Sequence, residues 1–373
     1  MTIAHVLSSF GMGGQERVAL DLAVGQRAAG QRVMAVTLES GDEGPLGAEF
    51  RARGAEVAHL RKRPGFDASL ILRLRRLFRE HRVAVVHTHN PQPLIYGGPA
   101  ARASGAVLVH TKHGVNADSD RRLWMKRAAG LLVDAFVAVS EPTADVARRI
   151  RECRPGRLHV IANGIDLSRF GPDDQARAAV RAELGIPGDA FVVGTVGRLG
   201  PEKAHPYFLR SVGPLLGPDF HVVIAGGGAE AERIAEVARG LPVPSSVHLL
   251  GMRRDVPRVL AAFDVFALTS VSEGLPLVIP EAMATRLPVV STAVGGIPQV
   301  VVEGETGMLV ESGDEAGLRD AVARLAGDRA LAARFAHAGR ERALSRYSSQ
   351  RMVDDYLALY RDCMSRRGID IAT

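Results

Sequence analysis

Two basic side chains lie in a glycine-bearing segment of the C-terminal half of the sequence. Arg198 and Lys203 belong to Gly197-Arg198-Leu199-Gly200-Pro201-Glu202-Lys203, which directly follows the apolar run 191–196. A guanidinium offers a planar fork of donors and an ammonium offers a point charge, so together they could clamp a diphosphate on which negative charge grows. The alternative interpretation is an ordinary solvated pair on a loop.

Two carboxylates, Glu273 and Glu281, stand eight residues apart in the segment 270–284. The first lies in a glycine-bearing loop and the second lies inside a predicted helix. An acidic pair around a helix N-terminus fits a site where the helix end holds phosphate and the carboxylates accept hydrogen bonds from sugar hydroxyls. A capped surface helix and a glycosidase-type pair flanking the scissile bond are the alternatives. The intervening helix and the nearby cations argue against the glycosidase.

A glycine turn, Gly11-Met12-Gly13-Gly14, connects the apolar run 3–9 to a helix predicted from about Gln15. Glycines let the backbone approach a ligand, and the free N–H groups of a helix N-terminus attract anions. Glu16 occupies the position where a dinucleotide fingerprint requires its third glycine. The sequence therefore does not predict an NAD site.

Two groups of residues are candidate metal ligands. His87 and His89 alternate on one face of a predicted strand, but the sequence shows no third ligand at a useful spacing. Asp118-Ser119-Asp120 spells the D-x-D of metal-dependent transferases of another fold, yet it lies in a charged loop without a flanking strand. We expect no metal site.

Short β-rich apolar runs alternate with amphipathic stretches along the whole sequence, which is typical of βαβ units. The alternation predicts an α/β fold with two doubly wound, Rossmann-like parallel sheets. Ligands of such sheets bind outside the carboxyl ends of the strands, and the candidate residues follow these ends. The predicted strands are 3–9, 32–38, 56–60, 84–89, 107–111, 135–139 and 158–161, then 191–196, 221–225, 247–250, 265–268, 288–291 and 307–310.

The length of 373 residues exceeds one hydrophobic core and favours two domains, which we place at 1–168 and 172–347. The glycine- and proline-rich stretch 163–189 is the predicted linker. Residues 348–363 predict a terminal amphipathic helix, continuing to about 373, with an apolar stripe of Met352, Val353, Tyr356, Leu357 and Tyr360.

Only two cysteines are present, no apolar signal region follows Met1, and no run reaches the ~18 apolar residues of a membrane span. We therefore expect a cytoplasmic protein.

The two halves of the sequence differ in charge. Residues 1–170 hold 25 basic and 16 acidic residues, whereas the rest holds 22 basic and 25 acidic residues. The basic half suggests an anionic partner, whether nucleic acid, anionic lipid or a phosphorylated substrate, or else a solvated basic surface. Its clusters are Arg61-Lys62-Arg63, then Arg73, Arg75, Arg76 and Arg79, and Arg121, Arg122, Lys126 and Arg127.

Taken together, these motifs resemble glycosyltransferase family 4. Glu273 to Ala284 is similar to the E-x7-E motif of that family, and Gly197 to Lys203 is similar to its G-R-L-x-x-x-K segment. Further matches run along nearly the whole chain: Gly13-Gly14-Gln15-Glu16-Arg17, His87-Thr88-His89, Thr111-Lys112-His113-Gly114, Val139-Ser140-Glu141, Asn163-Gly164-Ile165-Asp166 and Gly295-Gly296-Ile297-Pro298.

The resemblance implies a GT-B fold: two Rossmann-like domains facing a deep cleft, with the C-terminal helix crossing back to the first domain. It implies an acceptor-side first domain and a second domain that binds a nucleotide sugar. It also implies transfer of the sugar with retention of anomeric configuration, without a metal or other cofactor.

By position, the resemblance assigns roles to individual residues. Arg198 and Lys203 match the diphosphate clamp, and Glu281 matches the carboxylate on the ribose hydroxyls. Glu273 matches the residue that grips the donor sugar, and Gly274 and Leu275 follow it in the donor-binding motif. His113 matches the histidine at the reacting sugar face, and Gly13 and Gly14 match the loop against the phosphate. Two residues depart from the pattern, because Pro276 and Ala204 stand where glycine is usual.

The function expected from the resemblance is sugar transfer from a UDP- or GDP-linked donor to a glycan or lipid-linked acceptor of a bacterial polysaccharide or glycoconjugate. The alternatives are a nucleotide-sugar epimerase of the same architecture and a non-catalytic sugar-nucleotide binding module. The donor base would lie near residues 251–253. Nucleic acid is not an expected partner. We also hypothesise that the basic first domain docks reversibly on the anionic inner face of the cytoplasmic membrane.

Overall fold

The computed structural model describes residues 1–39, 44–114 and 120–369. The chain divides into two compact units, which we describe separately. The N-terminal unit comprises Met1–Gly164 and Ser349–Thr373, and the C-terminal unit comprises Ile165–Ser348. Among the described residues, no helix is both long and apolar enough to cross a membrane.

The N-terminal unit is built on a seven-stranded, wholly parallel sheet in the order β3-β2-β1-β4-β5-β6-β7. Its strands are β1 (Thr2–Leu7), β2 (Arg32–Thr37), β3 (Glu56–His59), β4 (Val85–His89), β5 (Val107–Lys112), β6 (Ala135–Ala138) and β7 (Leu158–Val160). Its helices are α1 (Gly14–Ala28), α2 (Pro45–Ala52), α3 (Ala68–Glu80), α4 (Pro91–Ser104), α5 (Asp120–Gly130), α6 (Glu141–Arg149) and α15 (Ser349–Arg366).

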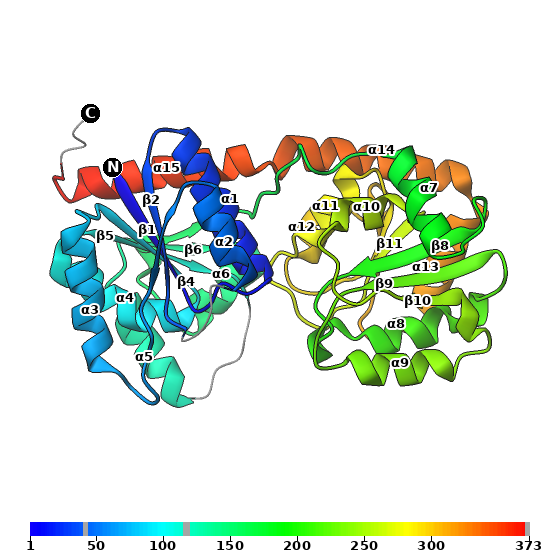
Figure 1. Cartoon of the computed structure of the whole chain (residues 1–373), viewed down its shortest axis with the longest axis horizontal. Helices are drawn as coiled ribbons and strands as arrows, with labels where there is room; N and C mark the ends of the chain where they lie inside the picture. The colour runs from blue at the N-terminus through cyan, green and yellow to red at the C-terminus, as the bar shows by residue number, and fades with distance from the viewer. Residues whose placement is uncertain (40–43, 115–119, 370–373) are drawn as a thin grey trace. The chain divides into compact units, whose positions relative to one another are not determined.

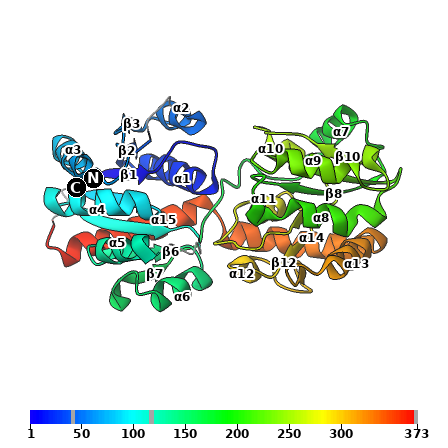
Figure 2. The ribbon, with the colours of Figure 1, turned by 90° about the horizontal axis from the view of Figure 1, so that it is seen from below.

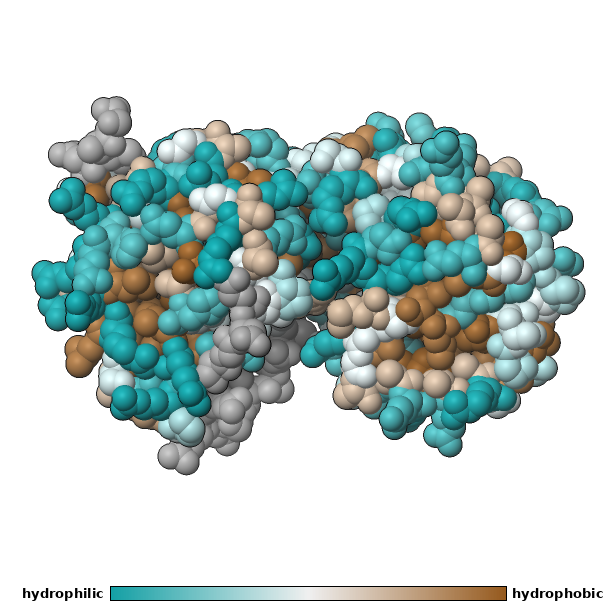
Figure 3. Space-filling view, in the orientation of Figure 1, coloured by the Kyte–Doolittle hydropathy of each residue, from teal (hydrophilic) through white to brown (hydrophobic). Residues whose placement is uncertain are grey.

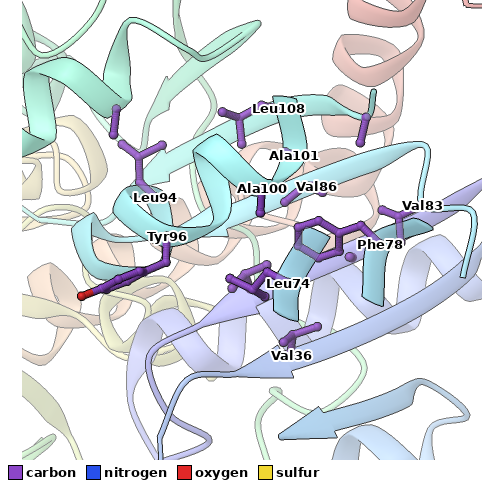
Figure 4. Packing of buried hydrophobic residues seen from close by; sticks show 14 of the residues in the cluster. Val36, Leu74, Phe78, Val83, Val86, Leu94, Tyr96, Ala100, Ala101 and Leu108 are labelled. Carbon is purple, nitrogen blue, oxygen red and sulfur yellow. The ribbon is translucent and has the colours of Figure 1, made fainter. Parts of the chain in front are cut away.

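The two faces of this sheet differ in polarity. Side chains alternate along a strand, so Ala4 and Val6 of β1 face α3 and α4, where they pack with Leu74 and Phe78 in an apolar core (Figure 4). Seen from below, α3, α4 and α5 lie next to one another in sequence order (Figure 2). The opposite face of the sheet carries histidines, and α1 and α15 cover it (Figure 1).

The C-terminal unit repeats the design with a six-stranded parallel sheet in the order β10-β9-β8-β11-β12-β13. Its strands are β8 (Phe191–Val196), β9 (Phe220–Ala225), β10 (Val247–Leu249), β11 (Val265–Leu268), β12 (Val289–Thr292) and β13 (Gly307–Val310). Its helices are α7 (Asp174–Glu183), α8 (His205–Val212), α9 (Ala231–Arg239), α10 (Val256–Ala261), α11 (Val278–Ala284), α12 (Ile297–Val300), α13 (Glu315–Gly327) and α14 (Arg329–Arg346). Residues of α8, α9 and α13 share one core with the sheet.

All the strands predicted from the sequence are present, and the two parallel Rossmann-like sheets of the predicted fold class are confirmed. The predicted stripe of the terminal helix is also confirmed. Met352, Val353, Tyr356, Leu357 and Tyr360 are buried on α15, which belongs to the N-terminal unit. Its packing is close: a Cβ added at Gly25 of α1 would lie 2.5 Å from Cγ2 of Val353.

The predicted linker 163–189 is wrong in its extent. Its middle forms α7, whose N-cap is Asp173, with a side chain that accepts from the backbone N–H of Ala176 at 2.8 Å. Arg177 and Arg181 of this helix form ion pairs with Asp264 in the C-terminal unit. The glycines and prolines on both sides mark the ends of this helix rather than an extended connection.

Candidate functional site

In the C-terminal unit, the loop after β8 carries both predicted clamp cations. It runs from Gly197 into a short 3-10 helix, Pro201–Lys203, and then into α8. The loop after β11 carries Ser270 and Glu273, and the two loops are tied together. The Thr269 hydroxyl donates to the Lys203 carbonyl at 3.0 Å, and the Val271 N–H donates to the Glu202 carbonyl at 2.9 Å.

Lys203 and Glu273 form an ion pair between these loops. The exposed fractions of the two side chains are only 16% and 12%. The Ser270 hydroxyl donates a second hydrogen bond to the same carboxylate oxygen, at 2.6 Å. The ammonium is therefore held in one place at the carboxyl edge of the sheet, partly shielded from water, where a charge interacts more strongly than in bulk solvent.

Arg198 lies on the same loop in a different environment. Its side chain is 73% exposed, and its Nη2 lies 2.6 Å from Oε1 of Glu202. An exposed pair of this kind adds little to stability, so the guanidinium is available to an incoming anion.

Glycines position the backbone around these charges. Gly295, in the loop after β12, has φ +54°, and a Cβ there would lie 1.8 Å from the carbonyl oxygen of Glu273. Only glycine lets the two loops approach this closely. Gly226-Gly227-Gly228 after β9, which were not among the predicted site residues, also line this loop: a Cβ at Gly226 would lie 1.8 Å from the Gly197 carbonyl oxygen. Three successive glycines after a predicted strand were the available signal.

The remaining donor-side candidates lie on or beside α11. Gly274, Leu275 and Pro276 are buried ahead of this helix, and Glu281 is half-buried in its first turn, where the sequence placed it. The segment 251–253 adjoins the glycine loop, because Gly226 N–H donates to the Gly251 carbonyl at 2.8 Å.

In the N-terminal unit, Gly13 is the N-cap of α1 and Gly14 is its first residue. Glu16 is buried, and its carboxylate folds back over Gly13: a Cβ there would lie 2.2 Å from Oε2. A glutamate at the third helical position can accept hydrogen bonds from the free N–H groups of the first turn. Its negative charge is also stabilised by the positive end of the helix dipole. An anionic ligand at Gly13 and Gly14 would share that end with the Glu16 carboxylate.

His113 follows β5 at the carboxyl edge of the same sheet. Its Nε2 lies 3.0 Å from Nδ1 of His89, and its backbone N–H donates to Oδ1 of Asn90 at 3.4 Å. Its Nδ1 is out of contact with solvent and has no hydrogen-bond partner among the described residues. Burial lowers the pKa of His113 to about 3, so the imidazole is neutral at physiological pH.

The expectation that His87 and His89 lack a third partner is wrong. Parallel pairing of β1 with β4 places His5 opposite His87, and one ligand atom from each of His5, His87 and His89 lies within 4.8 Å of the others. All three side chains are fully buried. Burial lowers the pKa of His5 to about 4 and holds those of His87 and His89 well below the usual range.

Two further sequence predictions concern α5 and the loop before it. Asp118 and Ser119 lie outside the described residues, and of Asp120 only its place at the start of α5 is described. Lys126 belongs to one of the predicted basic clusters, but it is buried, with Nζ 2.6 Å from Oε1 of Glu152. A buried lysine needs such a partner, and Glu152 lies 26 positions away in the sequence.

Comparisons with known proteins place these features in a family. Residues 12–169 match the model of Glycosyltransferase Family 4, and residues 190–328 match that of Glycosyl transferases group 1. An Escherichia coli UDP-Gal:alpha-D-GlcNAc-diphosphoundecaprenol alpha-1,3-galactosyltransferase is 30% identical over 71% of this chain and 72% of its own. An alpha-maltose-1-phosphate synthase of Mycolicibacterium smegmatis is 32% identical over 74% of this chain and 78% of its own.

The fold is shared with solved structures. The structure of HepE from Anabaena in complex with UDP and glucose has a TM-score of 0.86 with 22% sequence identity, covering 96% of this chain and 99% of that one. This likeness shows that the chain has the GT-B fold. The two family models match the regions of the sequence that contain most of the motifs on which the resemblance rests. The chain belongs to glycosyltransferase family 4.

Proposed function

We propose that the protein transfers a sugar from a UDP- or GDP-linked donor to a glycan or lipid-linked acceptor, with retention of configuration and without a bound metal. The observation that carries the proposal is the shielded Lys203 ammonium beside close-packed glycine loops. It is paired with Glu273, whose carboxylate is held in turn by the Ser270 hydroxyl. A nucleotide-linked donor is supported by the Escherichia coli relative, a galactosyltransferase that uses UDP-Gal.

The chemistry follows from where charge develops. As the glycosidic bond breaks, negative charge grows on the diphosphate leaving group and positive charge grows on the sugar ring. Lys203 and Arg198 stabilise the diphosphate, and this lowers the barrier because the interaction strengthens in the transition state. Glu281 accepts hydrogen bonds from the ribose hydroxyls. Glu273 and the neutral His113 orient the sugar, with Gly13 and Gly14 near the phosphates.

A turnover assay with EDTA present tests the proposal against its alternatives. Purified protein is incubated with UDP-, GDP- and ADP-sugars, with and without a lipid-linked glycan acceptor, and nucleotide and sugar are both analysed. Acceptor-dependent release of nucleotide with an α-linked product from an α-linked donor is expected. Rearranged donor sugar without transfer would indicate an epimerase. A thermal shift without turnover would indicate a binding module, because a ligand at 100 times its Kd stabilises by about 2.7 kcal/mol. Activity that needs added magnesium or manganese would contradict metal independence.

We further propose that the α3 side of the N-terminal unit docks on anionic membrane to reach a lipid-linked acceptor. Phe66, Leu72 and Trp124 are exposed, each with more than half of its residue surface accessible to solvent. Arg76 and Arg79 lie exposed on α3. Apolar side chains are visible among hydrophilic ones over this part of the unit (Figure 3). Leu74 and Phe78 of α3 face the core instead, as the amphipathic pattern suggested.

Vesicle co-sedimentation at low ionic strength tests the docking. Each basic residue near an anionic surface contributes about 1 kcal/mol, so reversing Arg76 and Arg79 to glutamate should lower binding by well over tenfold. Reversal of Arg233 and Arg239, which are exposed on α9 of the C-terminal unit, is the matched control. Equal binding to neutral and anionic vesicles would refute the docking. Lys126 is left unchanged because it is buried.

A further inference from the structure

A row of hydrogen-bonded side chains leads from α1 to His113 across the face of the sheet under α1 and α15. Gln26 Oε1 lies 2.8 Å from Nε2 of His5, and His5 Nδ1 lies 3.0 Å from Nε2 of His89. His89 Nδ1 lies 3.0 Å from Nε2 of His113. These four side chains come from α1, β1, β4 and the end of β5, so the fold itself aligns them.

Each imidazole in this row is neutral, because burial lowers its pKa. A neutral imidazole has one nitrogen that donates and one that accepts. Once the role of one nitrogen is fixed, the roles of all the others in the row follow. All hydrogen bonds along the row are therefore donated in the same direction, and the terminal group determines that direction.

Gln26 is that terminal group. Its Nε2 donates to the Tyr360 hydroxyl of α15 at 3.4 Å, which turns its Oε1 toward His5. With this amide orientation the proton of the Tyr360 hydroxyl is free for Nδ1 of His87, which lies 2.6 Å away. His87 then carries its own proton on Nε2, which lies 2.7 Å from the Thr111 hydroxyl oxygen. This second branch is satisfied with the same amide orientation.

With Oε1 of Gln26 as the acceptor, His5 carries its proton on Nε2. His89 must then donate from Nε2 to His5, and His113 must donate from Nε2 to His89. The remaining nitrogen of His113, Nδ1, keeps a bare lone pair. This is the atom that is buried without a partner among the described residues.

We propose that Gln26, His5 and His89 are positioning residues that hold His113 in the Nε2–H tautomer, so that its Nδ1 accepts a hydrogen bond from a hydroxyl of the bound sugar. The substrate class in this statement rests on the proposed function. The tautomer does not, because it follows from the protein's own hydrogen bonds.

A metal held by His5, His87 and His89 is the competing explanation for the cluster. All six ring nitrogens of these residues already take part in hydrogen bonds: to Gln26 and His89, to Tyr360 and Thr111, and to His5 and His113. Metal binding would break several of these bonds at once. The network explains every nitrogen without a metal, so we favour it.

Nitrogen NMR of protein labelled with 15N-histidine, free of nucleotide, tests the tautomer directly. The ring-nitrogen shifts distinguish a protonated nitrogen from a bare one, and the His113 signals are assigned by their loss in His113→Asn. We expect Nε2 protonated and Nδ1 bare. A protonated Nδ1 in the wild-type protein would overturn the proposal, as would stoichiometric metal in the purified protein with metal-shifted signals of His5, His87 and His89.

Two tyrosine variants provide a matched pair. Tyr360→Phe removes the hydroxyl that orients the Gln26 amide and should give a mixture of His113 tautomers. Tyr356→Phe removes a hydroxyl one turn away, which lies 2.8 Å from that of Thr111, and should leave the tautomer unchanged. Gln26→Met should also mix the tautomers and lower kcat about tenfold, the lower end of what losing a tautomer-fixing partner costs at metal-bound histidines. An unmixed tautomer in both Tyr360→Phe and Gln26→Met would refute the proposal.

The outcome separates this inference from the proposed function. An Nε2–H tautomer in a protein that transfers no sugar would leave the row intact and contradict the function. Sugar transfer by a protein whose His113 is protonated on Nδ1 would contradict the row alone.

Discussion

The two units use the same sheet design but hold their polar groups in different surroundings. Each sheet runs outward on both sides from its first strand, β1 in one unit and β8 in the other. The N-terminal unit carries neutral, fully buried histidines joined by hydrogen bonds. The C-terminal unit carries Arg198, Lys203 and Glu273 as ion pairs that are exposed or only partly buried.

This difference shows how the cost of desolvation sorts polar groups. A neutral imidazole with both nitrogens bonded can be buried cheaply, whereas a buried charge needs a partner and further hydrogen bonds. Lys203 lies between these cases, since it is shielded but paired. Neutral side chains with both nitrogens bonded can therefore lie deep in a core, while charged side chains stay near the surface.

The largest expected effect is that acid destabilises the N-terminal unit. Its buried histidines have folded-state pKa values below the unfolded value of 6.5, so the unfolded chain binds more protons and stability falls as pH drops below about 6.5. For His5 alone, a pKa of about 4 corresponds to roughly 3 kcal/mol lost by pH 4. His87, His89 and His110 act in the same direction.

Hydrogen exchange between pH 7 and 5, corrected for intrinsic rates, checks this. The amides of β1, β4 and β5 should lose protection before those of β8 and β11. Burial also lowers the pKa of His205 to about 4 and lowers that of His248, so acid destabilises the C-terminal unit over the same pH range. Because the C-terminal unit holds fewer such histidines, it should lose protection at lower pH. If the amides of both units lost protection at the same pH, the proposed difference in acid sensitivity between the units would be wrong.

The next largest effect concerns the clamp cations. Arg198→Ala and Lys203→Ala should each lower kcat by about 10²-fold or more, the typical cost of removing one preorganised group from a developing charge. Arg198→Ala should leave the melting temperature unchanged, because its ion pair is exposed. Arg210→Ala, which removes the exposed pair with Glu315, is the control for a surface charge. A variant with normal melting and near wild-type kcat would remove that residue from the clamp.

A smaller effect is expected for Glu281→Gln. The proposed contact of Glu281 with the ribose would exist before and after the reaction. The variant should therefore bind the donor and the free nucleotide diphosphate more weakly, and by the same factor. Hydrogen bonds to a charged group contribute about 1.5 to 3 kcal/mol, which corresponds to roughly 10- to 100-fold in Kd. Calorimetric titration of the nucleotide diphosphate measures this, with Glu232→Gln on the exposed side of α9 as the control. Unchanged affinity would mean that Glu281 does not contact the ribose.

The sequence predicted what short-range patterns encode. Alternating apolar runs predicted each strand, and the spacing of Met352, Tyr356 and Tyr360 predicted the buried stripe of α15. It also placed Glu273 in a loop and Glu281 in a helix. The roles of these residues in binding and catalysis stay predictions.

The sequence could not show contacts that depend on strand register. His5 and His87 are 82 positions apart and meet only because β1 pairs with β4 in one particular register. Lys126 can be buried because Glu152, from a distant part of the sequence, pairs with its ammonium. The helix α7 was not predicted because the glycines and prolines around it are typical both of helix ends and of linkers.

The place of α15 has a consequence for synthesis on the ribosome. Tyr360 and Tyr356, the partners of His87 and Thr111, lie more than 240 positions after them. The first unit to emerge thus cannot cover its row of histidines until all of the C-terminal unit has been made. Domains usually fold in the order in which they are made, but here the second unit can finish first. During that time one face of the nascent N-terminal sheet lacks the cover of α15. Because this face carries polar histidines, it is less prone to aggregation than an apolar face would be.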